Sequence, residues 1–292
     1  MSSIKASELI LNPDGSVYHL NLKPENIADT ILFVGDQDRV EKISKHFDHV
    51  EFETQKREFK THTGTLKGKR ITVISTGIGP DNIDIVMNEL DALVNIDLHS
   101  RKPKDQLTSL QIIRIGTSGS LQKEIPIDGF LMSSHGIDMS GLIHFYKLEA
   151  NHHHPEIEAD FIRHTKWNPK KAYPYIFSCS EKLAAKFSDA CMHTGITATA
   201  GGFYGPQGRV LRLPISDEML NDKLESFSKG QLRITNYEME TAVIYGMARL
   251  LGHEALSLNA IIANRPSRTF SEDPYLVVNR LITFALDKIV QN

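Results

Sequence analysis

The chain has 292 residues, of which 40% are hydrophobic and 24% are charged, and its formal net charge is −3 at pH 7. This length can bury a large core, and the composition is ordinary for a globular protein. The small negative charge gives no electrostatic reason to expect a nucleic acid or an anionic membrane surface as a partner. An anionic ligand would therefore need a local group of arginines.

Cys179 and Cys191 are the only cysteines, too few for a disulfide framework or a metal cluster. The N-terminus has no basic segment followed by an apolar stretch, and no apolar run reaches the length of a membrane span. We therefore expect a cytoplasmic protein without a structural metal.

Three short apolar runs organise the first half of the chain, and each is followed by a glycine turn signal. The runs are residues 31–34, 71–74 and 110–115, with turn signals at residues 35–36, 77–79 and 116–119 and helical patterns over residues 38–47 and 83–93. Apolar runs without alternation predict strands buried on both faces, and the intervening helices predict an α/β fold. Ligands of such folds bind at the carboxyl ends of the strands.

The second half is less regular. Residues 147–174 are rich in His, Pro, Lys and aromatics, and we expect a long surface excursion there. Further patterns predict helices over residues 180–193, 217–227 and 275–290, and strands over residues 196–200, 232–235 and 256–263. No repeat or linker interrupts the chain, so we predict one domain over residues 1–292 with a polar N-terminal segment over residues 1–28.

A run of three histidines, His152-His153-His154, lies within the expected excursion. Consecutive side chains of a loop point in different directions, and no acidic residue or cysteine has a suitable spacing for a shared metal. We therefore interpret the run as part of a surface loop.

Two glutamates lie at the start of an apolar helical pattern. Thr235 and Glu238 have the spacing of a capping box, which predicts a helix that begins near Thr235 and continues through Leu251. Glu240 is out of phase with that box and has apolar neighbours. It is either a carboxylate that interacts with the helix dipole or an acceptor for the two hydroxyls of a ribose.

Arginines occupy two unusual positions. Arg114 lies within an apolar strand, where an unpaired charge would be costly, so it is either paired with a buried carboxylate or placed to bind an oxyanion beside the glycine run 116–119. Arg39 follows Gly35 by about one helical turn, where a helix N-terminus and a cation can face one anion. An exposed arginine in the first turn is the alternative.

The chain has no Walker loop, and Gly77-Ile78-Gly79 is only part of a dinucleotide fingerprint.

Gln207 and Arg209 follow a glycine-rich segment. On an extended loop both side chains would point the same way, and the amide of Gln207 offers an adjacent donor and acceptor. With Phe203 or Tyr204 stacked on the ring, the pair could bind the polar edge of a pyrimidine. The alternative is a solvated loop.

Four motifs occur together in one order. They are Gly35-Asp36-Gln37-Asp38-Arg39-Val40, Arg114-Ile115-Gly116-Thr117-Ser118-Gly119, Phe203-Tyr204-Gly205-Pro206-Gln207-Gly208-Arg209 and Asn236-Tyr237-Glu238-Met239-Glu240. With this set the chain resembles the nucleoside phosphorylase-I superfamily and, within it, the uridine phosphorylases. The resemblance implies a single-domain, three-layer α/β/α sandwich with a mixed, partly barrel-like central sheet.

The same resemblance implies the roles of individual residues. Phosphate would be bound by Gly35, Arg39, Arg57, Arg114 and Thr117, ribose by His19, Met239 and Glu240, and the base by Phe203, Gln207, Arg209 and Arg265. The catalytic residues would be Arg114, Glu240 and Arg209. Arg57 and His19 would belong to the site of a neighbouring subunit, which implies a homodimer or a dimer-based oligomer. A monovalent cation near Glu58 and Ser75 is a further implication.

The implied reaction is the reversible, phosphate-dependent cleavage of uridine to uracil and ribose 1-phosphate in pyrimidine salvage. Inorganic phosphate would be a co-substrate, and no cofactor, nucleic acid or membrane partner is expected. The alternatives are a purine nucleoside phosphorylase or a nucleosidase of the same fold, or a non-catalytic nucleoside-binding protein. After Arg209, the apolar residues 210–213 depart from the polar continuation of the family.

Overall fold

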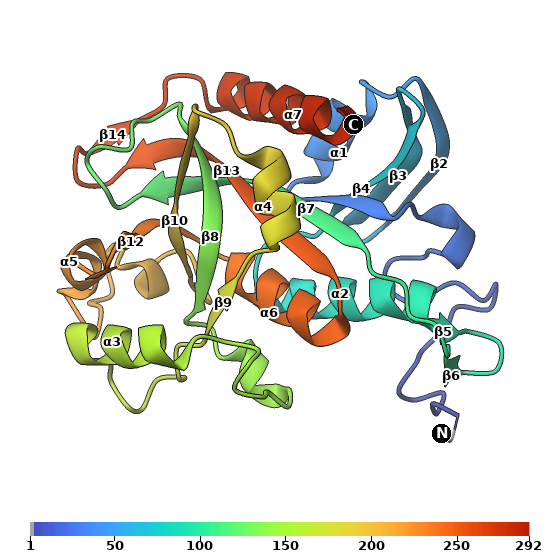
Figure 1. Cartoon of the computed structure of the whole chain (residues 1–292), viewed down its shortest axis with the longest axis horizontal. Coiled ribbons are helices and arrows are strands. Elements are labelled where there is room, and N and C mark those ends of the chain that lie inside the picture. Colours follow the sequence, from blue (N-terminus) through green and yellow to red (C-terminus); the bar gives the residue numbers. More distant parts are fainter. Residues whose placement is uncertain (1–2, 292) are drawn as a thin grey trace.

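The computed structural model describes residues 3–291, and its centre is a mixed sheet with helices on its faces (Figure 1). The strands are β1 (Thr30–Val34), β2 (His49–Lys56), β3 (Phe59–Leu66), β4 (Lys69–Ser75), β5 (Ile96–Asp97), β6 (Lys102–Pro103), β7 (Gln111–Ser120), β8 (Phe130–Asp138), β9 (Ile176–Ser178), β10 (Met192–Thr199), β11 (Ser228–Lys229), β12 (Leu232–Glu238), β13 (Glu254–Asn264) and β14 (Thr269–Phe270). The helices are α1 (Gln37–Ser44), α2 (Pro80–Asn95), α3 (Pro155–Thr165), α4 (Glu181–Phe187), α5 (Leu220–Glu225), α6 (Thr241–Leu251) and α7 (Pro274–Val290). Short 3-10 turns cover Pro24–Asn26, Leu142–Phe145 and Gly205–Gln207.

One end of the sheet closes into a barrel. The strand order is β11-β12-β10-β8-β13-β7-β1-β4-β3-β2, and β12 also pairs with β7 at Asn236↔Ser120 and Tyr237↔Gly119. Strands β7, β13, β8, β10 and β12 therefore form a closed ring, and β1, β4, β3 and β2 extend from it as an open sheet. The predicted α/β fold with a mixed, partly barrel-like sheet is confirmed.

Helices cover both faces of the sheet. In β1, Ile31 and Phe33 pack into a core with α2 and α6, whereas Leu32 and Val34 pack into a second core with α1 and α7. Each such side chain is almost fully buried and stabilises the fold by about 1.5–3 kcal/mol. Helices α3 and α5 pack together at the barrel end (Figure 1). The three-layer arrangement follows from strands that are apolar on both faces.

The predicted capping box is wrong, because Thr235 and Glu238 belong to strand β12 and α6 begins at Thr241. Glu238 still caps the helix from the end of the strand. Its Oε2 accepts hydrogen bonds from the backbone N–H groups of Glu240 and Thr241, both at 2.8 Å. The pattern therefore identified a capping carboxylate but placed the start of the helix too early.

Three other local predictions differ from the structure. The glycine run 116–119 continues β7 instead of forming a turn, because β7 pairs there with β13 and β12. The expected surface excursion contains α3, whose Phe161 is fully buried. The helix expected over residues 180–193 ends at Phe187, and β10 begins at Met192. Within residues 3–291, no helix is long and apolar enough to cross a membrane.

Candidate active site

The carboxyl ends of β1, β7 and β12 surround a cavity of about 280 Å³. It is lined by most of the residues that the sequence motifs indicate: Gly35, Arg39, Arg114, Thr117, Phe203, Gln207, Arg209, Met239 and Glu240. These residues come from segments far apart in the chain, and the closure of the barrel brings them together. Arg265 lies behind Gln207, while His19 and Arg57 are outside the cavity.

Arg114 lies at the centre of the cavity wall and is buried. Its Nη2 donates to Oε2 of Glu240 at 2.6 Å, and its Nη1 donates to Oδ1 of Asn259 at 3.0 Å. Burial disfavours the charge of the guanidinium, but Glu238 and Glu240 more than compensate, so the pKa of Arg114 is raised. The sequence offered two alternatives for Arg114, a buried ion pair or a place at an anion site. The structure shows the ion pair, and the same arginine also lines the cavity.

A glycine makes this position of Arg114 possible. Gly116 lies two residues further along β7, on the same face of the strand. A Cβ atom at Gly116 would lie 1.9 Å from Nη1 of Arg114. Any other residue would displace the guanidinium, so the glycine of this motif is required for packing and not for a turn.

Glu240 precedes α6 and is held from two sides. Its Oε1 accepts a hydrogen bond from the backbone N–H of Gly79 at 2.7 Å, and its Oε2 accepts the bond from Arg114. Gly79 has φ +104°, a conformation that favours glycine. Burial raises the pKa of Glu240, while Arg114 acts in the opposite direction. Each carboxylate oxygen keeps one lone-pair direction for a ligand hydroxyl.

Arg39 is the second cation of the cavity. Its Nη1 donates to the carbonyl oxygen of Ile115 at 3.1 Å, and it forms no ion pair with a carboxylate in the part of the chain that the structure describes. Burial, and then the like charge of Arg114, lower the pKa of Arg39. Two guanidinium groups that repel one another beside a cavity form a site for an anion.

Gln207 is fixed at the other end of the cavity. It belongs to a 3-10 turn, not to the extended loop that we expected. Its Oε1 accepts hydrogen bonds from Nη1 of Arg209 at 2.6 Å and from Nη2 of Arg265 at 3.0 Å. The two arginines therefore define the orientation of the amide, and Nε2 remains as a donor for a ligand.

The arginines beside Gln207 have no carboxylate partner among the described residues. Burial lowers the pKa of Arg209, and burial together with repulsion from Arg209 lowers the pKa of Arg265 to about 10. The guanidinium of Arg209 stacks on Phe203, 3.8 Å from the ring centroid. Of the two aromatics that the sequence offered, Phe203 lines this cavity and Tyr204 lines a neighbouring one.

His19 and Arg57 do not reach the cavity of their own chain. His19 Nδ1 lies 2.6 Å from Oε1 of Glu89, and the same carboxylate accepts the backbone N–H of Leu20 at 2.8 Å. Arg57 is exposed at the tip of the β2–β3 hairpin, with φ +57°. Their expected contacts with a neighbouring subunit remain predictions.

Glu58 and Ser75 lie side by side, since the hydroxyl of Ser75 donates to the backbone oxygen of Glu58 at 2.6 Å. The expected monovalent cation at this position remains a prediction.

His153 contacts the buried carboxylate of Glu158 at 2.9 Å. Within residues 3–291, no group of three or more His, Cys, Asp or Glu side chains is arranged to bind a metal ion.

Several residues of the site were not identified from the sequence. Asn259 binds Arg114, and an asparagine in the middle of the apolar strand β13 was the available signal. The hydroxyl of Tyr237 is buried without a partner in the described structure, and Arg265 stacks on its ring at 4.7 Å. Phe270 lines the cavity from β14 and is 62% exposed. Nothing local in the sequence distinguishes Phe270 from other exposed aromatics.

These features are those of a site that can accommodate an anion beside a small polar ligand. A family model described as "Phosphorylase superfamily" matches residues 29–285. The chain is 30% identical to the uridine phosphorylase of Escherichia coli over 260 residues, which is 85% of this chain and 86% of the relative. The chain therefore belongs to the phosphorylase superfamily and, within it, to the uridine phosphorylase family.

Other comparisons agree with this membership. The uridine phosphorylase of Thermococcus kodakarensis is 29% identical over 89% of this chain and 81% of its own length. A crystal structure of a Trypanosoma brucei nucleoside phosphorylase that "shows uridine phosphorylase activity" has a TM-score of 0.86 and 28% identity, with coverage of 97% and 99%. A DeoD-type purine nucleoside phosphorylase from Listeria welshimeri is 24% identical over 94% of this chain and 99% of its own length.

Proposed function

We propose that this protein cleaves uridine with inorganic phosphate and forms uracil and ribose 1-phosphate. The observation that carries the proposal is Arg39, a cation without a carboxylate partner among the described residues, directed into the same cavity as Arg114 and Glu240. Phosphate would supply the missing negative charge. The opposite end of the cavity offers the donors of Gln207 and Arg209 to a base.

Phosphate would bind between Arg39 and Arg114, near Gly35 and Thr117. The two arginines would place an oxygen of phosphate behind the anomeric carbon of the ribose. This converts an encounter of two molecules into an oriented reaction within one complex. The C–O bond forms while the N-glycosidic bond breaks, and the bonding electron pair leaves with the base.

Glu240 would accept hydrogen bonds from the ribose 2′- and 3′-hydroxyls, with Met239 against the sugar. Its negative charge also lies near the anomeric centre, which becomes positive as the glycosidic bond breaks. Since Arg114 contacts Glu240, the groups that hold phosphate and ribose are in direct contact. The position of one substrate is thereby tied to that of the other.

Gln207 and Arg209 would stabilise the departing uracil. Negative charge develops on the ring and its carbonyl oxygens, and the Nε2 of Gln207 is a donor directed by Arg209 and Arg265. Fixed donors near developing charge commonly accelerate a reaction by about 10²–10³ each. No nucleophilic side chain and no cofactor is needed for these steps.

The complete site would require two subunits. His19 and Arg57 lie outside the cavity of their own chain, so we propose a homodimer in which each subunit supplies them to its partner. A homodimeric enzyme of pyrimidine salvage in the cytoplasm is the setting that we propose for the reaction.

The test is base release from uridine, thymidine and inosine by the purified protein. We expect uracil release from uridine to have the highest kcat/KM. A preference for inosine would favour purine nucleoside cleavage, an activity named for the Listeria relative, and would contradict the pyrimidine assignment. Binding of uridine without turnover would favour a non-catalytic nucleoside-binding protein.

A further inference from the structure

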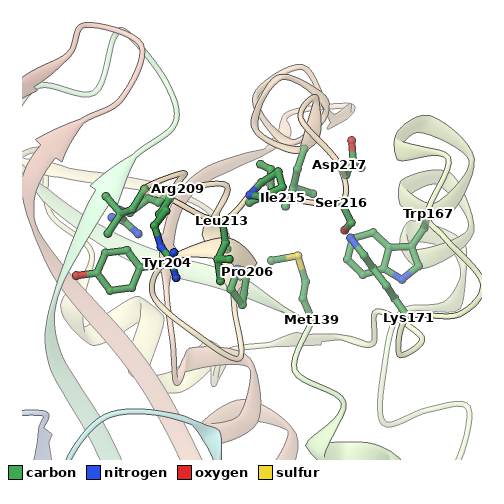
Figure 2. A pocket seen from close by; sticks show the side chains of 15 residues that line it. Met139, Trp167, Lys171, Tyr204, Pro206, Arg209, Leu213, Ile215, Ser216 and Asp217 are labelled. Carbon is green, nitrogen blue, oxygen red and sulfur yellow. The ribbon is translucent and has the colours of Figure 1, made fainter.

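A second cavity, of about 740 Å³, lies beside the base end of the catalytic cavity, because both are lined by Arg209. Arg209 therefore lies between the two cavities. Figure 2 shows the side chains that line the second cavity. The remaining walls come from residues 204–206, from the segment after Arg209, from the loop after α3 and from Met139. The proposed reaction uses none of these walls apart from Arg209.

The cavity has mainly apolar walls. Met139, Pro206, Leu213 and Ile215 lie between Tyr204 on one side and Trp167 on the other (Figure 2). Leu213 is 73% exposed, although it belongs to a wall of a concave site. A ligand that covers these side chains gains about 25 cal/mol for each Å² of apolar surface removed from water.

Three cations line the same cavity, namely Lys171, Arg209 and Arg212. Within residues 3–291 none of them forms an ion pair with a carboxylate. The acidic residue of the cavity, Asp217, is already paired with Lys223 at 2.9 Å. The uncompensated charge of the cavity is therefore positive.

The cations are placed next to the aromatic wall. The Nζ of Lys171 lies over the face of the Trp167 ring, 4.9 Å from its centroid, so a ligand that packs against the edge of Trp167 would have a cation beside it. Arg212 is exposed, and no hydrogen bond restricts its side chain in the described structure. An apolar surface with adjacent unpaired cations fits an apolar anion better than a neutral ring or a hydrophilic anion.

We propose that this cavity is a second ligand site, which binds a small aromatic carboxylate. The aromatic ring would pack between Trp167 and the apolar wall at Leu213, and the carboxylate would face Lys171 and Arg212. Because Arg209 also contacts Gln207, a bound ligand would lie one side chain away from the base site. This inference does not depend on the identity of the nucleoside substrate.

Trp167 makes the site directly observable, because it is the only tryptophan of the chain. The probe is phenylbutyrate, and its matched neutral control is phenylbutyramide. We expect phenylbutyrate to change the Trp167 emission with a saturable dependence on concentration, and the amide to bind about tenfold more weakly or less. An equal response to both compounds would contradict an anion site, and the absence of a response to phenylbutyrate would contradict the site itself.

Two variants test whether Lys171 and Arg212 bind the carboxylate of phenylbutyrate. Lys171→Gln with Arg212→Gln should weaken phenylbutyrate binding about tenfold, and Arg212→Gln alone should weaken it severalfold without removing the contact of Lys171 with Trp167. Arg249→Gln removes an exposed arginine from another surface cavity and should leave binding unchanged. Equal affinity in all variants would overturn the proposed role of the cations.

Two further outcomes would show that the second cavity is not a site for an aromatic carboxylate. If uridine displaces phenylbutyrate competitively while the emission of Trp167 stays constant, the probe occupies the catalytic cavity and the proposal is wrong. If the emission changes on dilution of the protein and not with the probe, a second copy of the chain covers the cavity. Neither outcome bears on the cleavage of uridine, so failure of this inference is distinct from failure of the proposed function.

Discussion

The side chains of Arg114 and Glu240 form a buried ion pair at the centre of the catalytic cavity, with 2.6 Å between Nη2 and Oε2. Both side chains are less than one-tenth exposed. Removing one member of such a pair leaves the other charge buried without a partner, at a typical cost of about 3–5 kcal/mol. The pair therefore connects the stability of the site to its proposed chemistry.

Glu240→Gln should fold but lose most of its activity. The amide removes the negative charge that orients Arg114 and that would stabilise the positive transition state, so we expect kcat/KM for uridine to fall about 100-fold or more. Glu158→Gln is the matched control, because Glu158 is also fully buried but lies outside the catalytic cavity. Equal losses of activity in the two variants would show that Glu240 acts only through stability.

Arg39→Met should separate stability from phosphate binding. Burial and the charge of Arg114 both disfavour the charged form of Arg39, so its removal should leave the Tm of the ligand-free protein unchanged or raise it by a few degrees. Saturating phosphate should raise the Tm of the unmodified protein, since a ligand at about 100 times its Kd contributes about 2.7 kcal/mol.

The variant should lose this response to phosphate. Thermal unfolding with and without phosphate measures both effects. Lys45→Met, which removes an exposed cation next to α1, is the control and should retain the response. A phosphate-induced rise in Tm that persists in Arg39→Met would exclude Arg39 from the phosphate site.

Gln207→Glu tests the orientation of the amide. A carboxylate between Arg209 and Arg265 should be well tolerated, so we expect the free energy of unfolding to be unchanged or higher. The variant has no donor in place of Nε2, and KM for uridine should increase about tenfold or more, with kcat reduced as well. Steady-state kinetics and denaturant unfolding measure the two quantities. A normal KM would mean that the base does not contact this side chain.

Mixing two inactive variants tests the shared site. In a heterodimer of Arg57→Ala and Glu240→Ala subunits, one site combines an intact Glu240 with the Arg57 of the partner subunit. The other site carries both substitutions. After subunit exchange, random mixing should restore up to about a quarter of the activity, because half of the dimers then have one complete site. No recovery, with exchange verified, would contradict the contribution of Arg57 to a neighbouring subunit.

The stability of the protein should decrease between pH 6.5 and pH 4, partly because of His135. Burial, and then the neighbouring His154, lower the pKa of His135 from 6.5 to about 4. In this range the unfolded chain binds more protons than the folded chain, so the free energy of unfolding falls as the pH falls. Above pH 7 both states are neutral at this residue and the contribution vanishes.

His135→Gln should make this pH dependence less steep. The contribution of His135 is roughly 1–2 kcal/mol, because its side chain is only half-buried and faces the partly exposed Glu156. Burial also lowers the pKa values of His46 and His62, so part of the slope should remain. Denaturant unfolding at several pH values measures the slope. An identical slope in the variant would refute the assignment to His135.

The sequence predicted those parts of the site where residue chemistry conflicts with its surroundings. Arg114 in an apolar strand and Glu240 beside an apolar helix both indicated buried polar contacts, and the structure places them 2.6 Å apart. Strands that are apolar throughout predicted a sheet covered on both faces. These signals are local, because they depend on the cost of burying a charge or exposing an apolar run.

Contacts between distant segments were not predictable in the same way. The pairing of β12 with β7 closes the barrel and turns a presumed helix start and a presumed glycine turn into strands. No local pattern specifies such a pairing, which depends on the register of residues more than a hundred positions apart. The orientation of Gln207 likewise depends on Arg265, which approaches from the end of β13. The β2–β3 hairpin was not predicted either, although the side chains of β2 alternate in exposure along the strand.

The most direct test of the account is the phosphate dependence of uracil release from uridine. We predict that release requires inorganic phosphate and that ribose 1-phosphate accumulates in amounts equal to uracil. Uracil release at the same rate in phosphate-free buffer, with free ribose as the second product, would contradict the account.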